Sequence, residues 1–269
     1  MTNNHKSEKL VLIDIDDGVG TLTLNRLTAL NAFNLELAEE FIRGVDFLKE
    51  KAAVRAIVIC GAGRVFSAGG DVREMLSNVE SGDRAAYFRA PLAAFHRMSL
   101  AVRCATKPVL ASVHGAVAGV AFNLMLACDL RIAAEGTRFT QAFVRLGLSP
   151  DGGGTYLLPR LVGHARATEL TMLPTEISAE TALAWGLINW VVPADALEAE
   201  TKTIAAKLAQ GPSVALGRLK DLMNRAENDA LAEHMEKERL AQVENAATED
   251  FEEGLRAFME KRKPNFRGR

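Results

Sequence analysis

The sequence contains no apolar run long enough to cross a bilayer, has only three cysteines, and carries no strong excess of either charge. A membrane-spanning helix needs about 20 consecutive apolar residues, so an integral membrane protein is not expected. The net charge of -2 at pH 7 provides no general attraction for nucleic acid or for anionic lipid. We therefore expect no nucleic-acid partner and no membrane partner, and we look for function in a pocket.

The three cysteines, Cys60, Cys104 and Cys128, are odd in number and lie far apart within apolar segments. This pattern fits neither a disulfide framework nor a zinc site and predicts buried, reduced thiols. The first nine residues are polar and lack the apolar centre of a signal peptide. Together these features predict a cytoplasmic protein.

Several common catalytic motifs are also missing. The chain has no Gly-Lys-Ser/Thr triplet of a P-loop, no His-Glu-x-x-His metal pair and no Gly-x-Ser-x-Gly nucleophile turn. Gly61-Ala62-Gly63 follows a strand-like run, but Phe66 occupies the position of the third glycine of a dinucleotide fingerprint. We therefore expect no metal site, no dinucleotide site and no serine nucleophile.

What the chain does contain is an alternation of strand-like and helix-like segments, which is typical of the α/β fold class. The alternating runs at 10–15 and 19–24 flank Asp16-Asp17-Gly18, a hairpin signal. Asn34 is the expected N-cap of the amphipathic helix that follows. Strand-like runs recur at 56–60, 109–113 and 130–133, and helix-like runs at 84–102 and 120–128. Strand signals end near Pro193, which predicts a core over 1–200 and a helical region over 201–269.

Two turns rich in small residues, at 66–71 and 114–119, each follow an apolar run and precede a helix-like segment. Such turns leave backbone N–H groups unpaired, and these can stabilise negative charge that develops on an oxygen. One turn of this kind would be ordinary loop chemistry. The pair, together with the acidic Asp151-Gly152-Gly153-Gly154 segment, indicates an enzyme with an oxyanion hole.

The segments 107–115, 127–133 and 66–72 resemble the crotonase, or enoyl-CoA hydratase/isomerase, superfamily, and the resemblance covers nearly the whole chain. It implies a spiral of ββα units of the crotonase type, related to the ClpP fold. It also implies a helical C-terminal region that forms trimers and often hexamers. The implied substrate is an acyl-CoA thioester, with no tightly bound cofactor because coenzyme A is part of the substrate.

The resemblance also implies the catalytic residues. The N–H groups of Gly70 and Val120 would form the oxyanion hole. Typical hydratases of this family hold a water between two glutamates, and the matching positions here are Asn123 and Phe143, neither of which can take a proton from water. Asp151 instead matches the single acid/base of isomerase members such as those acting on ring-opened or epoxidised phenylacetyl-CoA.

The same match gives the residues expected to bind substrate. Basic side chains would meet the CoA phosphates, although Ala29 stands where relatives often carry one of them. For Asp71, capping of the following helix is the favoured interpretation. The residues expected near CoA are Arg26, Ala29, Leu30, Ala32, Ala68, Gly69, Asp71, Val72 and Lys261. Those expected around the acyl group are Met75, Leu76, Leu92, Asn123, Phe143 and Leu148.

The favoured hypothesis is an acyl-CoA isomerase in which Asp151 moves a proton along a thioester enolate. Burial against Phe143 and Leu148 would raise the pKa of Asp151, whereas a following helix N-terminus would lower it. Capping of that helix is a second role that the sequence leaves open for Asp151. Two alternative functions are a 2-enoyl-CoA hydratase in which Asp151 activates water, and a non-catalytic member that acts as a scaffold or binds RNA.

Overall fold

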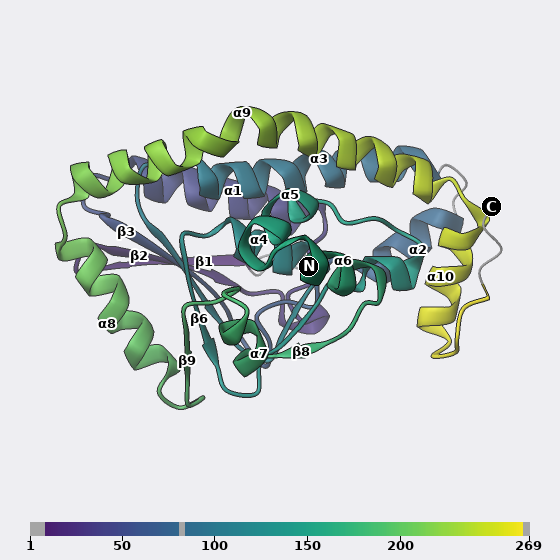
Figure 1. The fold of residues 1–269 in the computed structure, drawn as a ribbon, viewed down its shortest axis with the longest axis horizontal. Coiled ribbons are helices and arrows are strands. Elements are labelled where there is room, and N and C mark those ends of the chain that lie inside the picture. The colour runs from purple at the N-terminus through teal and green to yellow at the C-terminus, as the bar shows by residue number, and fades with distance from the viewer. Residues whose placement is uncertain (1–8, 81–83, 266–269) are drawn as a thin grey trace, which may run out of the picture.

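The computed structural model describes residues 9–80 and 84–265, without the side chains of residues 84, 225–230 and 237. The polar first eight residues lie outside these ranges. In the described part, six strands form one sheet in the order β1-β2-β3-β4-β6-β9, and a small second sheet has the order β5-β7-β8. Helices cover the sheets (Figure 1). The mixed α/β class with C-terminal helices is therefore as predicted.

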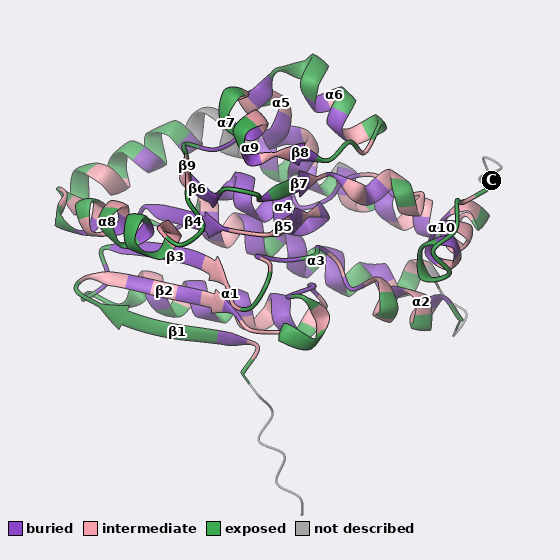
Figure 2. Cartoon of the chain, turned by 90° about the horizontal axis from the view of Figure 1, so that it is seen from below, coloured by how far each residue is buried: buried purple, intermediate pink, exposed green. Residues whose placement is uncertain are grey.

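The large sheet begins with the predicted hairpin. β1 (Val11–Asp16) pairs antiparallel with β2 (Val19–Leu24), and Asp16 is opposite Val19. Asp17 and Gly18 make the turn with φ angles of 42° and 81°, the left-handed conformation that a two-residue hairpin loop requires. β1 is mostly exposed along the sheet edge, whereas the interior strands are buried (Figure 2).

The helix after the hairpin is capped as predicted. α1 (Leu35–Glu50) begins after Asn34, whose side-chain oxygen accepts a hydrogen bond of 3.0 Å from the Leu37 N–H. This bond satisfies one of the N–H groups that a helix start leaves unpaired. Phe41 and Leu48 on the apolar face of this helix are completely buried. They therefore fix α1 on the core.

Parallel strands form the rest of the large sheet. β3 (Ala56–Gly61), β4 (Val109–Val113), β6 (Leu130–Ala134) and β9 (Trp190–Val192) follow β2 in parallel register. The small sheet contains β5 (Ala116–Ala118), β7 (Arg138–Thr140) and β8 (Ile177–Ser178). The connecting helices are η1 (Leu27–Ala29), α2 (Val72–Glu80), α3 (Arg84–Arg103), α4 (Gly119–Ala127), η2 (Ala142–Leu146), α5 (Gly154–Val162), α6 (His164–Met172) and α7 (Ala179–Ala184).

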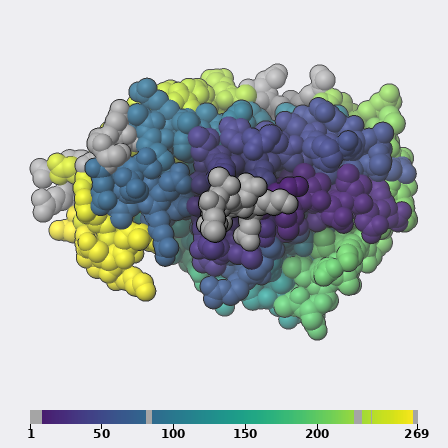
Figure 3. Space-filling model, turned by 180° about the vertical axis from the view of Figure 1, so that it is seen from behind, coloured from purple at the N-terminus to yellow at the C-terminus, as the bar shows by residue number. Residues whose placement is uncertain are grey.

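Three helices follow β9 in the part of the chain that the structure describes. α8 (Leu197–Gln210) packs on β3, and α9 (Ser213–Ala246) runs across α3 and α5 (Figure 1). α10 (Glu249–Met259) returns to pack on α2 and η2, and Figure 3 shows this end of the chain beside the α2 and α3 segment. α8 crosses residue 200, so the boundary expected there falls inside a helix that packs on the sheet. The division into a core and a helical region stays a prediction.

One prediction about the cysteines is wrong. Cys128 is buried, but Cys60 is half-buried and Cys104 is exposed, because Cys104 lies just beyond the C-terminal end of α3, where the chain turns toward β4. All three are free thiols. No helix in the described part of the chain is long and apolar enough to cross a membrane. The cytoplasmic location stays a prediction.

Candidate active site

In the first small-residue turn, residues 66–71, the Gly70 N–H points away from Phe33, to which Gly70 is bridged. A parallel bridge joins Gly70 to Phe33, in which the Asp71 N–H donates to the Phe33 carbonyl (2.9 Å) and the Phe33 N–H donates to the Gly69 carbonyl (2.6 Å). In such a bridge the N–H of the central residue points to the opposite side. Gly69 has φ 97°, and a Cβ there would lie 2.8 Å from the Ala118 carbonyl oxygen. The two small-residue turns are therefore in close backbone contact.

The second turn leads directly into α4. Gly119, at the start of this helix, has φ 50°, and the N–H of Val120 lies in the first turn, where a helix provides no acceptor for its N–H groups. The ring of Phe143 lies against Gly119, 3.7 Å from where a Cβ would stand. Gly70 and Val120 both line one cavity.

A cavity of about 110 Å³ lies between the two turns. Its wall is mainly apolar and is built from α2, α3, η2, α9, α10 and the segments before α4 and α5. Its lining residues are Ala68, Gly69, Gly70, Val72, Met75, Phe88, Phe95, Ala118, Gly119, Val120, Ala142, Phe143, Arg145, Leu146, Leu148, Asp151, Gln242 and Phe258. The structure thus brings together the three residues predicted to be catalytic.

Asp151 is the only carboxylate among the described residues that line this cavity. Its side chain is nearly completely buried, with 3% of the residue exposed, and its Oδ2 lies 3.5 Å from the Gln242 amide nitrogen. Its Oδ1 has no hydrogen-bond partner in the described part of the chain. Burial raises the pKa of Asp151 to about 8, and the negative charge of Glu238 adds to the shift. Burial therefore outweighs the helix N-terminus that follows.

Asp151 does not cap α5 with its carboxylate. That position is taken by Glu238 of α9, whose carboxylate accepts hydrogen bonds from the N–H groups of Gly153 (2.9 Å) and Thr155 (3.0 Å) and from the Thr155 hydroxyl. Burial raises the pKa of Glu238 as well. His234 contacts the same Thr155 hydroxyl at 2.7 Å. Glu238 thus binds the N–H groups at the start of α5, and the Asp151 side chain lines the cavity instead.

Sequence reasoning missed Glu238, Gln242 and Phe258. Glu238 and Gln242 continue the buried stripe of α9 that includes Leu231 and Met235, with the spacing of one helix face. Polar residues at such positions are a detectable signal, because buried polar groups need a partner. The chain segment that provides the partner lies more than 80 residues earlier, so the signal does not identify it.

Asn123 occupies a different place from the one expected. It is completely buried and does not line the cavity. Its amide Nδ2 donates to the Asp151 carbonyl (2.8 Å), and its Oδ1 accepts from the Gln141 amide (2.7 Å). A Cβ on Gly154 would lie 2.4 Å from the Asn123 amide nitrogen, so the glycine is what allows this approach. Asn123 therefore joins α4 to the Asp151 segment and does not face a substrate.

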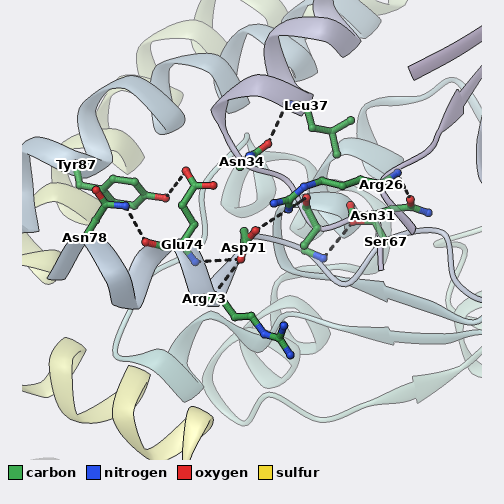
Figure 4. A network of polar contacts seen from close by, with 12 residues as sticks. Arg26, Asn31, Asn34, Leu37, Ser67, Asp71, Arg73, Glu74, Asn78 and Tyr87 are labelled. Carbon is green, nitrogen blue, oxygen red and sulfur yellow. Dashed lines mark hydrogen bonds and ion pairs between the residues drawn. The ribbon is translucent and has the colours of Figure 1, made fainter. Parts of the chain in front are cut away.

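Asp71 caps a helix, as favoured from the sequence. Its Oδ1 accepts from the N–H groups of Arg73 and Glu74 at the start of α2, both at 3.1 Å. Its Oδ2 forms an ion pair with Arg26 Nη1 at 2.6 Å, and the same nitrogen donates to the Ala32 carbonyl at 2.9 Å. Figure 4 shows Asp71 between the Arg26 side chain and the start of α2. This network holds the residue that directly follows Gly70.

The remaining predicted residues lie partly outside the cavity. Met75, Val72, Phe143 and Leu148 line it, whereas Leu92 and Leu76 pack into the adjoining apolar core. Ala29, the last residue of η1, is half-buried, and the Leu30 that follows it is exposed. Ala32 is buried, and Lys261 is exposed beyond the end of α10. Arg26 is engaged by Asp71.

Comparison with known proteins agrees with this architecture. Residues 14–269 match the model of the enoyl-CoA hydratase/isomerase family. The chain belongs to this family. As an enoyl-CoA hydratase/isomerase family member it is an enzyme of the crotonase superfamily, as the sequence predicted, and its neighbours in structure share the crotonase fold.

Similar members of the enoyl-CoA hydratase/isomerase family carry both isomerase and hydratase names. The trans-2-decenoyl-[acyl-carrier-protein] isomerase of Streptococcus mutans is 39% identical over 97% of this chain and 99% of that protein. The 1,2-epoxyphenylacetyl-CoA isomerase of Escherichia coli is 37% identical over 97% and 99%. A crystal structure of an enoyl-CoA hydratase from Mycobacterium avium subsp. paratuberculosis superimposes with a TM-score of 0.86 at 33% identity, covering 96% of this chain and 98% of that one.

Proposed function

We propose that the protein is an acyl-CoA isomerase that moves a carbon–carbon double bond by proton transfer. The observation that carries this proposal is that Asp151 is the one carboxylate among the described residues of an apolar cavity that Gly70 and Val120 also line, and that it is buried. One carboxylate is enough for a proton shuttle, since the group that takes a proton can return it elsewhere.

The proposed reaction begins when the thioester carbonyl of a 3-enoyl substrate accepts hydrogen bonds from the Gly70 and Val120 N–H groups. These donors stabilise an enolate and so acidify C2. Asp151 removes a proton from C2, and the electron pair delocalises over the carbonyl and the former 3,4 double bond. The Asp151 carboxylic acid then donates the proton to C4, leaving a 2,3 double bond and a regenerated carboxylate.

The raised pKa of Asp151, about 8, suits this role. A carboxyl with an ordinary pKa near 4 is a weak base and holds a proton poorly. Raising its pKa toward the working pH makes the same group a stronger base and a usable acid. The apolar wall around it provides the shift and also limits access of water.

A hydratase would need groups that hold and deprotonate a water. Phe143 lines the cavity but carries no polar atom, and both polar atoms of the Asn123 side chain are engaged away from the cavity. These contacts favour isomerisation over hydration. Hydration with Asp151 as the base is the alternative that the experiment below tests.

The test compares a 3-enoyl-CoA with crotonyl-CoA, using the wild type and Asp151→Asn. We expect double-bond migration in the wild type, little hydration, and a loss of at least about 10³-fold in kcat for the variant, since it loses the general base. Binding of a non-reactive CoA thioester, measured by calorimetry, should be retained. Near-normal isomerisation by Asp151→Asn, or faster hydration than isomerisation in the wild type, would contradict the proposal.

Assembly into trimers or hexamers is part of the same proposal. Side chains that support it are apolar and exposed on the first half of α9: Val214, Leu219, Leu222 and Met223. Exposed apolar patches of this kind mark contact surfaces. Light scattering of the purified protein should give three or six times the 29.1 kDa of one chain, and a monomer at micromolar concentration would contradict it.

A further inference from the structure

The buried amide of Gln242 lies beside Asp151 in the cavity wall. Gln242 comes from α9, is 1% exposed, and places its Nε2 3.5 Å from Asp151 Oδ2. Its Oε1 has no hydrogen-bond partner in the described part of the chain, and neither has Asp151 Oδ1. A buried polar atom without a partner is costly, so two such atoms on neighbouring side chains that line an apolar cavity indicate a functional arrangement.

We propose that Gln242 is a positioning residue that holds Asp151 Oδ2 and thereby assigns the proton transfer to Oδ1. This inference depends on the isomerase reaction proposed above. The Nε2–H group donates to Oδ2, which fixes the rotation of the carboxylate. The second oxygen, without a partner, is the one that accepts the proton from C2 and returns it to C4. Gln242 itself exchanges no proton.

The 3.5 Å separation fits a substrate-free site. Hydrogen bonds of catalytic groups are often long before the substrate binds and shorten in the complex. A neutral carboxylic acid accepts a weaker hydrogen bond than a carboxylate does, and burial keeps Asp151 largely protonated at neutral pH. The contact therefore strengthens as Asp151 ionises, and Gln242 stabilises the basic form.

Other charged groups near Asp151 either oppose its ionisation or are bound elsewhere. Glu238, one helical turn before Gln242 on α9, raises the pKa of Asp151 through its negative charge. Arg145 of η2 also lines the cavity, but it donates to the Pro174 carbonyl at 2.6 Å. The other cavity-lining residues from α2, α3 and α10 are Val72, Met75, Phe88, Phe95 and Phe258, which carry no charge. Gln242 is thus the side chain that favours ionised Asp151.

The experiment measures the pH dependence of kcat/KM for 3-enoyl-CoA isomerisation by Gln242→Met. Methionine keeps the volume but cannot donate a hydrogen bond. We expect the pH midpoint of kcat/KM to rise by about one unit, since a hydrogen bond to a charged group contributes about that much. We also expect kcat to fall about tenfold at neutral pH, with KM nearly unchanged. Gln210→Met, an exposed position at the end of α8, is the matched control and should leave the profile unchanged.

Two further measurements distinguish a failure of the role proposed for Gln242 from a failure of the isomerase proposal. Infrared titration of the carboxylic acid band that Asp151→Asn removes gives the Asp151 midpoint without turnover, and it should shift upward in Gln242→Met. If Gln242→Met fails to fold, Gln242→Leu, which is also uncharged and cannot donate, is expected to give the same upward shift. An unchanged midpoint in a folded variant, with Asp151→Asn inactive, would overturn the role of Gln242 alone. An active Asp151→Asn would overturn the isomerase proposal itself.

Discussion

The side-chain amide of Asn123 donates a 2.8 Å hydrogen bond to the main-chain carbonyl of Asp151. Asn123 lies one turn after Val120 on α4, so this bond joins the helix that carries one proposed oxyanion donor to the segment that carries the Asp151 carboxylate. The amide is itself held by Gln141. The distance between donor and base is thus set by a side chain that does not line the cavity.

Asn123→Leu should weaken this connection. The Gln141 amide would lose its acceptor in a completely buried place, which costs about 1–3 kcal/mol of folding free energy. Displacement of Asp151 relative to Val120 should also lower kcat by roughly 10²-fold, since misplaced catalytic groups are costly. Denaturant unfolding and steady-state kinetics measure the two effects. Wild-type kcat in a destabilised Asn123→Leu would show that the bond serves stability alone.

The pH profile of the wild type follows from the ionisation of Asp151. In the proposed reaction the carboxylate is the form that removes the C2 proton, and the pKa of the group is raised to about 8 by burial and by Glu238. The value of kcat/KM should therefore increase with pH and level off above about 8. A profile that is already flat at pH 5 would contradict the assignment of Asp151 as the base.

Glu238→Gln should shift that profile downward. The two carboxylate oxygens of Glu238 accept from Gly153 and Thr155 separately, so the single oxygen of a glutamine keeps one of these two bonds, and the negative charge near Asp151 is gone. With less repulsion, Asp151 ionises at lower pH. We expect the midpoint of kcat/KM to fall, and an upward shift would contradict this electrostatic account. Glu244→Gln, at an exposed site on α9, is the control.

The stability of Asp151→Asn should depend on pH with a definite sign. The folded pKa lies above the unfolded value of 3.8, so the contribution of the neutral carboxyl is complete below pH 3.8 and is lost as pH rises through about 8. Asparagine at this position does not ionise, so the stability of the variant lacks this pH-dependent loss. The free energy of unfolding of the variant relative to wild type should therefore increase between pH 5 and pH 8, by at most about 1.4 kcal/mol per pH unit. Its Tm relative to wild type should increase in the same direction. Calorimetry at both pH values checks this, and a constant difference would contradict it.

Arg26→Met tests two roles of the arginine. The ion pair with Asp71 holds the segment after Gly70, so its loss should lower kcat/KM for every thioester by roughly tenfold, because one oxyanion donor is displaced. A phosphate contact, as predicted from the sequence, would instead raise KM for CoA esters only. Comparing a CoA thioester with an N-acetylcysteamine thioester, which has no phosphates, distinguishes the two. A loss confined to the CoA ester would favour the phosphate contact.

Local patterns predicted the fold well. The hairpin turn at Asp17-Gly18, the Asn34 cap and the Asp71 cap depend on residues within a few positions of one another, and each is present in the structure. The two small-residue turns were found for the same reason, because strand, turn and helix start are contiguous in the chain.

Long-range packing could not be predicted in this way. That Glu238 replaces Asp151 as the cap of α5, and that Gln242 reaches the cavity, depends on how α9 crosses α5 and α3. The orientation of Asn123 depends on the close approach that Gly154 permits. Burial at Asp151 results from long-range packing, and the direction of its pKa shift follows from that burial.

Glu238 and Gln242 stand one turn apart on α9, which contributes nothing to either oxyanion turn. In the proposed reaction, the side chains that set the pKa of Asp151 and the main-chain groups that bind the thioester therefore belong to separate parts of the molecule. Substitutions at two positions of one late helix can retune the carboxyl for a more or less acidic substrate carbon while the thioester is held as before. In the proposed reaction, α9 is therefore a place where reactivity is adjusted independently of binding.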